Sequence, residues 1–419
     1  MKKTLAQKLH ERHVHKPNFI LYNLLANVWK LTVARKYHFT YELIDDPKKE
    51  KGPYILISNH ASRADYIFTA LPLLLHRLNY IMGYNEFFRS HLKGIVTLLQ
   101  EIPKRNFYPD MYTVMEAKRL VKQGGRLCLF PEGMNSIGGG SQPVALGNAK
   151  FLKFLDIPVY VCHIDGGYLT GPKYNLTDRI GRVHSTIKRL FTVEELRAHS
   201  IDEITDILNK EIWTDDYAYN KKEKILYKTD SVALHAEQLL YKCPKCGAEH
   251  IMTSTNNSIV CPKCGYEVLM DNYYNIKSKD GSFCFDTPKD WFEYEREEVK
   301  KEIQDPNFYF EEEVDVGFLP EFKPLKDQKT SEIRGSGILR IDHNGIHFKG
   351  TKDGAEYNME LTLQETPTYG MCTDASRFYT FNKGEFVEFY PRRNSTIKWL
   401  FVTEELHRLH GGKWQNYKK

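Results

Sequence analysis

The sequence lacks several features that would define a protein class at once. It has no run of about 18 apolar residues, so we expect no ordinary transmembrane helix. With 27 glycines and 18 prolines in 419 residues it has no excess of either, which argues against collagen-like, wholly disordered and coiled-coil proteins. It begins Met-Lys-Lys without a compact apolar core or a small-residue cleavage site, so we expect no secretory signal. The 41% hydrophobic content can fill packed cores, and the length predicts two to four domains.

The formal net charge of +5 hides an asymmetry along the chain. Residues 1–200 carry a net charge of +13, whereas residues 201–419 carry −8. A basic first half predicts an anionic partner. Composition alone leaves three partners open, namely nucleic acid, an anionic membrane surface and phosphorylated substrates.

Residues 1–40 combine basic flanks with a dense apolar stretch. They hold eight Lys or Arg against one acid, Glu11, and Asn23, Asn27 and Lys30 interrupt the apolar stretch at helical spacing. Two interpretations stay open, an amphipathic helix in an anionic membrane interface or a surface helix on the following domain. We assign this segment as membrane-association helices, which predicts a peripheral or monotopic protein at the cytoplasmic face of the membrane.

Residues 41–230 alternate between strand and helix patterns. Strands are expected over 53–58, 126–130 and 157–162. Helices are expected over 65–78, 112–123, 148–155 and 193–211. The alternation predicts an α/β domain, in which helices flank a mixed, largely parallel sheet.

The clearest chemical signal follows the first of these strands, in Asn59-His60-Ala-Ser-Arg-Ala-Asp65. With His60 in the loop and Asp65 in the first helical turn, the carboxylate can hold one imidazole nitrogen. The other nitrogen is then left to take a proton from a hydroxyl. This spacing is common by chance, so taken alone it also fits a structural histidine. A second motif, Phe130-Pro131-Glu132-Gly133, ends another strand, at the sheet edge where α/β proteins bind ligands.

Together and in this order, the two motifs resemble those of the glycerolipid acyltransferase superfamily of 1-acyl-glycerol-3-phosphate acyltransferases. The resemblance covers roughly residues 20–215. Its matching blocks are Asn59-His60…Asp65, Glu101-Ile102-Pro103-Lys104-Arg105, Phe130-Pro131-Glu132-Gly133 and Ile157-Pro158-Val159. It implies that His60 is the general base and that Asp65 orients it. It also implies that Lys104 and Arg105 bind the acceptor phosphate, and that Glu132 and Gly133 shape the acceptor site.

The resemblance further implies the reaction. A fatty acyl group would pass from acyl-CoA or acyl-carrier protein to the free hydroxyl of a lysophospholipid, with 1-acyl-glycerol 3-phosphate giving phosphatidate. One departure leaves the acceptor open, because Asn135 stands where the family usually has Arg. The alternatives are the same chemistry on glycerol 3-phosphate or an aminolipid, and a non-catalytic lipid-binding scaffold. These motifs favour an anionic membrane and a phosphorylated acceptor as partners, and no nucleic acid is expected.

The eight cysteines divide into two groups. Cys243-Pro-Lys-Cys246 and Cys261-Pro-Lys-Cys264 form two pairs, and the other four are scattered, which indicates a reducing compartment and a metal site. Two such pairs are typical of a zinc ribbon, here assigned to residues 231–275. A redox motif and an iron centre are the alternatives, but redox motifs rarely come as two pairs. Four thiolates leave no open coordination position, so the Zn²⁺ is expected to be structural.

The remaining residues are assigned to two segments, an acidic connector over 276–329 and a β module over 330–419. Within the connector, residues 290–315 hold eleven acids and three bases. Within the module, Asn344-Gly345 predicts a hairpin, and residues 395–409 have a helix pattern. Strands followed by one helix resemble a pleckstrin-homology or GRAM-like barrel, a likeness of architecture alone.

Overall fold

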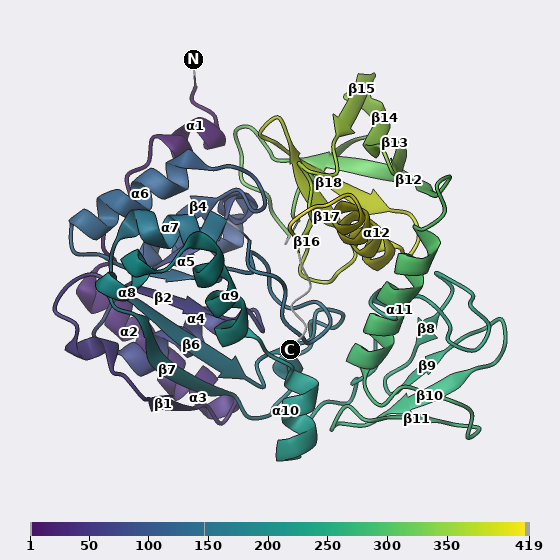
Figure 1. Ribbon diagram of the computed structural model, residues 1–419, viewed down its shortest axis with the longest axis horizontal. Helices are drawn as coiled ribbons and strands as arrows, with labels where there is room; N and C mark the ends of the chain where they lie inside the picture. Colours follow the sequence, from purple (N-terminus) through teal and green to yellow (C-terminus); the bar gives the residue numbers. More distant parts are fainter. Residues whose placement is uncertain (1, 146, 328, 415–419) are drawn as a thin grey trace.

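A seven-stranded sheet forms the centre of the first half of the chain in the computed structural model, which describes residues 2–145, 147–327 and 329–414 (Figure 1). Its strand order is β1-β7-β6-β2-β5-β3-β4, and β1 and β7 run antiparallel to the other five. The strands are β1 (Thr40–Leu43), β2 (Ile55–Ser58), β3 (Leu78–Gly83), β4 (Ile102–Lys104), β5 (Arg126–Leu129), β6 (Val159–Asp165) and β7 (His184–Phe191). The expectation of a mixed, largely parallel sheet is confirmed.

Helices cover both faces of this sheet because its central strands are apolar on both sides. Ile55 and Ile57 of β2 pack with α6 (Met111–Lys122), α7 (Gly147–Leu155) and α9 (Ile201–Ile212). Leu56, between them, points to the opposite face, where α2 (Phe19–Leu31) and α4 (Asp65–Ala70) pack. This alternation is the two-residue period of a strand that is buried on both faces.

Two expected helices are shorter in the structure. The helix expected over 65–78 ends at Ala70, where a 3-10 helix (Leu71–Leu73) containing Pro72 follows, and β3 begins at Leu78. The helix expected over 193–211 is two helices, α8 (Val193–Ala198) and α9. Ser200 separates them because its side chain accepts the Glu203 N–H and starts a new helix with a capping box.

Three helices precede the sheet, α1 (Leu5–His10), α2 and α3 (Val33–Lys36). Helix α2 buries Tyr22, Ala26 and Trp29 against the sheet domain, as a packed surface helix does. Its other side exposes large apolar side chains, namely Phe19, Ile20, Leu21, Leu24, Val28 and Leu31. One helix therefore has both the buried side expected of a packed surface helix and the exposed apolar side expected of a membrane-interface helix. Among the described residues, no helix has the length and apolar character needed to span a bilayer.

A small four-stranded antiparallel sheet follows α10 (Asp216–Glu223). Its strands are β8 (Thr253–Ser254), β9 (Ser258–Val260), β10 (Glu267–Met270) and β11 (Ile276–Ser278). The loop before β8 and the turn between β9 and β10 carry the two cysteine pairs. The expected short, cysteine-bearing segment is thus a separate small sheet.

The C-terminal part is a seven-stranded antiparallel sheet with the order β15-β14-β13-β12-β18-β17-β16. Its strands are β12 (Tyr309–Phe318), β13 (Glu332–Asp342), β14 (Gly345–Lys352), β15 (Ala355–Leu361), β16 (Gly370–Met371), β17 (Phe378–Asn382) and β18 (Glu385–Pro391). The hairpin expected at Asn344-Gly345 is present between β13 and β14, with His343 and Asn344 as its turn and Gly345 as the first residue of β14. In the part of the chain that the structure describes, β15 and β16 are the two ends of this sheet and do not pair. A closed barrel is therefore not shown, and the pleckstrin-homology or GRAM-like module stays a prediction.

Strand β12 lies within the segment that the sequence assigned to an acidic connector. Its many acidic residues obscure the alternation of a strand. Phe310, Val314 and Val316 are buried in the core, whereas Glu311 and Glu313 are exposed. The sheet therefore begins at residue 309, before the expected boundary at 330.

Helix α11 (Pro288–Glu302) connects the small sheet to the C-terminal sheet, and α12 (Thr396–Leu409), which follows β18, packs against α11. In Figure 1, α11 lies between these two sheets on the right, and the first half of the chain lies on the left. Arg296 of α11 pairs with Glu404 and Glu405 of α12 at 2.6 and 2.9 Å, and all three side chains are buried. Truncating one member of such a buried set leaves an uncompensated charge, so the pairing fixes the two helices together.

Candidate active site

The candidate site lies at the carboxyl end of β2, between β5 and β6. Asn59 holds this end in place, because its side-chain amide donates to the Ile164 carbonyl at 2.8 Å and accepts the Ile164 N–H at 2.7 Å. These two bonds tie the loop after β2 to β6. His60 therefore leaves the sheet edge in a fixed direction, at the place where α/β sheets bind ligands.

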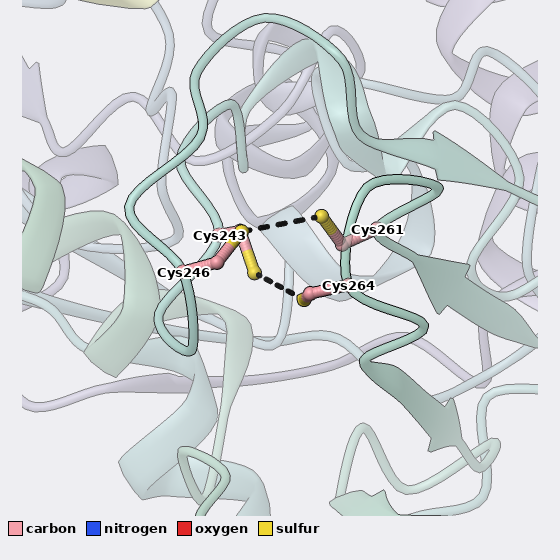
Figure 2. A group of neighbouring side chains, drawn as sticks. All are labelled: Cys243, Cys246, Cys261 and Cys264. Atoms are coloured by element: carbon pink, nitrogen blue, oxygen red, sulfur yellow. Dashed lines mark hydrogen bonds between the residues drawn. The ribbon is translucent and has the colours of Figure 1, made fainter.

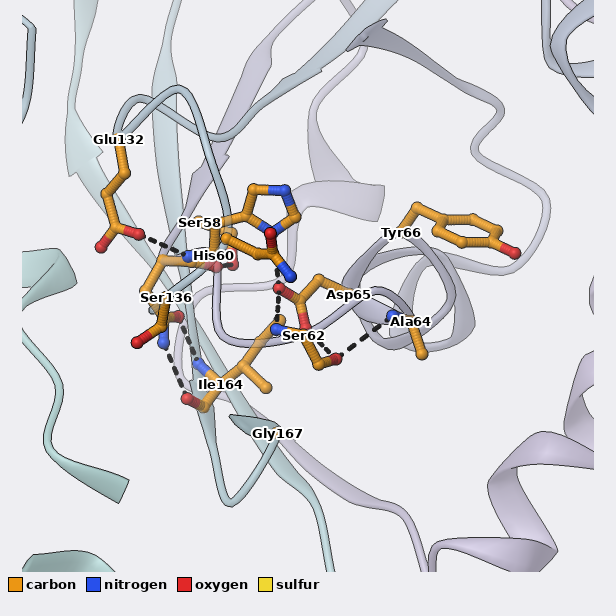
Figure 3. A network of polar contacts seen from close by, with 12 residues as sticks. Ser58, His60, Ser62, Ala64, Asp65, Tyr66, Glu132, Ser136, Ile164 and Gly167 are labelled. Atoms are coloured by element: carbon orange, nitrogen blue, oxygen red, sulfur yellow. Dashed lines mark hydrogen bonds and ion pairs between the residues drawn. The ribbon is translucent and has the colours of Figure 1, made fainter. Parts of the chain in front are cut away.

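His60 and Asp65 are in contact, as the sequence predicts. The distance from His60 Nδ1 to Asp65 Oδ2 is 2.8 Å (Figure 3). The Asp65 carboxylate is fully buried and also accepts the Ser62 N–H at 2.8 Å and the Ser62 hydroxyl at 2.7 Å. An ionised carboxylate only accepts hydrogen bonds, so the ring proton is on Nδ1 and Nε2 carries the lone pair. The imidazole ring stacks on Phe130 at 4.3 Å between centroids, with a quarter of its surface exposed.

Glu132 approaches His60 from the side opposite Asp65 (Figure 3). Its Oε2 accepts the His60 backbone N–H at 3.1 Å, and only 1% of the residue is exposed. Burial raises the pKa of this carboxyl well above its usual range. Glu132 does not line the cavity described below, whereas its neighbour Gly133 does. The structure therefore brings both residues to the site, but Glu132 contacts the backbone of His60.

The two basic residues of the second block point in different directions. Lys104 lines the cavity, and its Nζ donates to the Arg105 carbonyl at 3.3 Å. Burial lowers the pKa of the Lys104 amine. The Arg105 side chain lies instead against His10, at 2.8 Å from Nη2 to Nε2, and over the Tyr84 ring. Arg105 is not among the residues that line the cavity, so the structure does not bring it together with His60.

A cavity of about 1190 Å³ opens beside His60. Part of its wall is apolar and comes from the first half of the chain, including Tyr80, Ile81, Met82, Ile95, Leu129 and Phe151. Another part comes from the C-terminal half, including Thr373, Asp374, Arg377, Tyr379, His407 and Trp414. Such a volume with mixed lining can hold a lipid-like molecule that has an apolar chain and a polar end.

The sequence analysis missed the C-terminal wall and also Lys173, which lines the cavity and is 3% exposed. Lys173 lies in an irregular segment after β6, and no motif surrounds it. The C-terminal residues come from a sheet whose position on the first domain depends on long-range packing. Local sequence patterns therefore predict neither Lys173 nor the C-terminal residues as part of the cavity.

The four cysteines of the two pairs converge on one point (Figure 2). Their sulfurs lie within 4.8 Å of one another, with 3.7 Å from Cys243 to Cys264 and from Cys246 to Cys261. Zn–S bonds of about 2.3 Å place tetrahedral sulfurs about 3.8 Å apart, so the cluster fits a zinc ion. The Ala248 N–H lowers the pKa of Cys246 to about 7, which favours the thiolate that binds metal.

The sheet, the His60–Asp65 pair and the second motif together define an α/β domain of the acyltransferase class. Residues 39–165 match the family model described as "Acyltransferase". This part of the chain is therefore an acyltransferase-family domain, which confirms that part of the resemblance. Among solved structures, a similar chain is the 1-acyl-sn-glycerophosphate (LPA) acyltransferase PlsC from Thermotoga maritima. It is 15% identical with a TM-score of 0.39, over 48% of this chain and 79% of that chain. No curated protein matches the sequence.

The contact between Glu132 and the His60 backbone predicts that Glu132→Ala destabilises the protein more than Glu132→Gln does. Glu132→Ala removes the acceptor of the buried His60 N–H, and we expect it to lower the free energy of unfolding by about 1–3 kcal/mol. Glu132→Gln keeps an acceptor oxygen and resembles the neutral carboxyl that burial favours, so its stability should stay closer to that of the unmodified chain. Urea unfolding followed by circular dichroism measures both. Equal stability of the Ala variant and the unmodified chain would contradict the account of this contact.

Proposed function

We propose that the chain is an acyltransferase that moves a fatty acyl group from acyl-CoA or acyl-carrier protein to a lysophospholipid. The expected acceptor is 1-acyl-glycerol 3-phosphate, and the product is phosphatidate. The observation that carries this proposal is the His60–Asp65 pair, which opens onto a cavity inside a domain of the acyltransferase family.

The geometry supports a general-base mechanism. Nε2 of His60 takes the proton of the acceptor hydroxyl while the hydroxyl oxygen attacks the thioester carbonyl. The new ester C–O bond forms, the C–S bond breaks, and the imidazolium returns its proton to the leaving thiolate. Asp65 keeps His60 in the required tautomer and stabilises the imidazolium. Glu132 positions His60 through the backbone, and Lys104 and Gly133 contribute to the cavity wall.

Loss of the base tests this proposal. We expect His60→Ala to reduce acyl transfer to 1-acyl-glycerol 3-phosphate by at least about 100-fold, because general-base catalysis contributes this much or more. Asp65→Asn should also lose activity, because it removes the charge that stabilises the imidazolium. Radiolabelled acyl-CoA and acyl-carrier protein, each offered with the acceptor, measure the rate.

His347→Ala is the matched control for this experiment. His347 also contacts a carboxylate, Glu360, but it lies on β14 and does not line the cavity. Its variant should keep the unmodified rate, and circular dichroism should show all variants folded. Unchanged acyl transfer in folded His60→Ala protein would refute the mechanism.

We further propose that α2 attaches the protein to the cytoplasmic face of an anionic membrane. Ile20 and Leu24 lie one turn apart on the helix and are 74% and 62% exposed. Lys30 and the basic residues of α3 lie close by in the sequence, where they can meet anionic head groups. None of the eight cysteines forms a disulfide, which suits a reducing compartment.

Vesicle sedimentation tests this attachment. The chain should sediment with phosphatidylglycerol vesicles at low salt and be released at high salt, because the lysines act through screened charge. Leu24→Glu should weaken sedimentation, whereas Phe283→Glu, at an exposed apolar residue before α11, should not. Salt-insensitive binding would mean that apolar insertion dominates. Absence of binding at low salt would contradict the proposal for α2.

For the cysteine cluster we propose a structural Zn²⁺ within a ribbon. The cluster offers four thiolates, and Cys243 and Cys261 are fully buried. When bound, the ion would crosslink the two pairs and stabilise the small sheet.

Metal analysis tests this site. We expect about one zinc per chain by inductively coupled plasma mass spectrometry. Cys264→Ser should lose zinc and lower the melting temperature, whereas Cys284→Ser, outside the cluster, should keep both. Chelation should have the effect of Cys264→Ser. A chain that is purified without zinc, binds none when it is added, and has an unchanged melting temperature would contradict the proposal.

A further inference from the structure

Lys173 is a buried cation whose position needs an explanation. Its residue is 3% exposed, and its Nζ donates to Asn135 Oδ1 at 2.6 Å. No carboxylate of the described residues lies within ion-pair distance of it. An amide oxygen satisfies one hydrogen bond but does not neutralise an ammonium group. Burying such a charge without a counter-ion costs several kcal/mol, so this arrangement favours an anionic ligand.

Two other cations that line the cavity, Arg377 and Arg63, differ from Lys173. Arg377 lies beside Asp374 at 3.9 Å and Glu388 at 3.8 Å, so its charge is balanced within the C-terminal domain. Arg63 donates to the Leu176 carbonyl at 3.0 Å in an exposed position. Lys173 is therefore buried, lines the cavity and has no ion pair with a carboxylate of the described residues.

Lys173 also lies next to the catalytic loop. Asn135, its hydrogen-bond partner, is followed by Ser136, whose N–H donates to the His60 carbonyl at 2.7 Å. The structure thus places the Lys173 amine beside the loop that carries Asn135 and Ser136, although Lys173 comes from a different segment of the chain.

The C-terminal domain encloses this part of the cavity. Cys372, Thr373 and Asp374, in the segment between β16 and β17, line the cavity together with Lys173. No ion pair joins Asp374 to Lys173, and Asp374 Oδ1 accepts the Ser376 N–H and hydroxyl. A ligand that contacts Lys173 would therefore lie between the acyltransferase domain and the C-terminal sheet.

We propose that Lys173, oriented by Asn135, binds the phosphomonoester of the acceptor, and that the 372–374 segment of the C-terminal domain encloses this head group. This inference rests on the proposed acyltransferase function and assigns its acceptor site. It gives the C-terminal domain a direct part in acceptor selection.

The test compares acceptors that differ only in the anionic group. Lys173→Met keeps the length of the side chain and removes its charge. We expect it to raise KM for 1-acyl-glycerol 3-phosphate at least about tenfold, since charged hydrogen bonds contribute about 1.5–3 kcal/mol. KM for the neutral 1-acyl-glycerol should change less than threefold. Lys277→Met, at an exposed lysine of β11, should change neither.

The conservative variant adds a pH readout. Burial lowers the pKa of Lys173 to about 8, while Cys372, Asp374 and Glu86 raise it and Arg63 lowers it. The ammonium is charged below this value, so kcat/KM for the anionic acceptor should fall as the pH rises through about 8. Lys173→Arg keeps its charge and should move this fall to higher pH.

A third variant tests the enclosure. Thr373→Trp fills space at the C-terminal wall and should raise KM for 1-acyl-glycerol 3-phosphate without lowering the melting temperature. Inactivity of the unmodified chain toward every acceptor would refute the proposed function itself. An active chain in which Lys173→Met keeps its KM for the anionic acceptor would refute the role of Lys173 alone. An unchanged KM in Thr373→Trp would refute the enclosure.

Discussion

The cavity beside His60 depends on one continuous hydrophobic core that joins the loop after β2 to the C-terminal half. Ala61, next to His60, belongs to the same buried cluster as Trp291 of α11 and Phe401 of α12. The close approach shows at Gly138, where a Cβ would come within 2.6 Å of the Phe292 ring. A side chain at Gly138 would therefore clash with Phe292 of α11 unless that ring moved. Through this core the C-terminal half packs on the first half, and some of its residues form part of the cavity wall.

Three buried ionisable groups around the cavity have three different environments, and these define their roles. Asp65 accepts hydrogen bonds from the His60 ring and from both Ser62 donors, which hold the imidazole in place. Glu132 is buried and accepts the His60 backbone N–H, and burial raises its pKa. Lys173 donates to the Asn135 side chain and has no carboxylate of the described residues within ion-pair distance. The site therefore combines one oriented imidazole, His60, with one buried amine, Lys173, and this is the arrangement on which the proposed binding of an anionic acceptor rests.

The parts that could be predicted from the sequence depend on local patterns. The apolar runs at β2, β5 and β6, the five-residue spacing of His60 and Asp65 and the spacing of the cysteine pairs all carry their geometry within short segments. The rest depends on long-range packing. In β12, charged residues obscured the alternation of buried and exposed side chains. The helix that begins at Asp65 ends before Pro72, and β3 follows. The Arg105 side chain contacts His10 of α1, which is distant in the sequence. Lys173 could not be predicted as a site residue, because its surroundings are formed by Asn135 and by cavity-wall residues about 200 positions later in the sequence.

The central claim is that one cavity, formed by two parts of the chain, holds the acceptor with its hydroxyl at His60 and its anionic group at Lys173. A crystal structure of the full chain with 1-acyl-glycerol 3-phosphate, without acyl donor, tests this most directly. The account predicts the free hydroxyl at about 2.6–3.2 Å from His60 Nε2, and the phosphate in contact with Lys173 Nζ beneath residues 372–374. An acceptor bound with its hydroxyl away from His60, or with its phosphate outside the enclosed cavity, would contradict it.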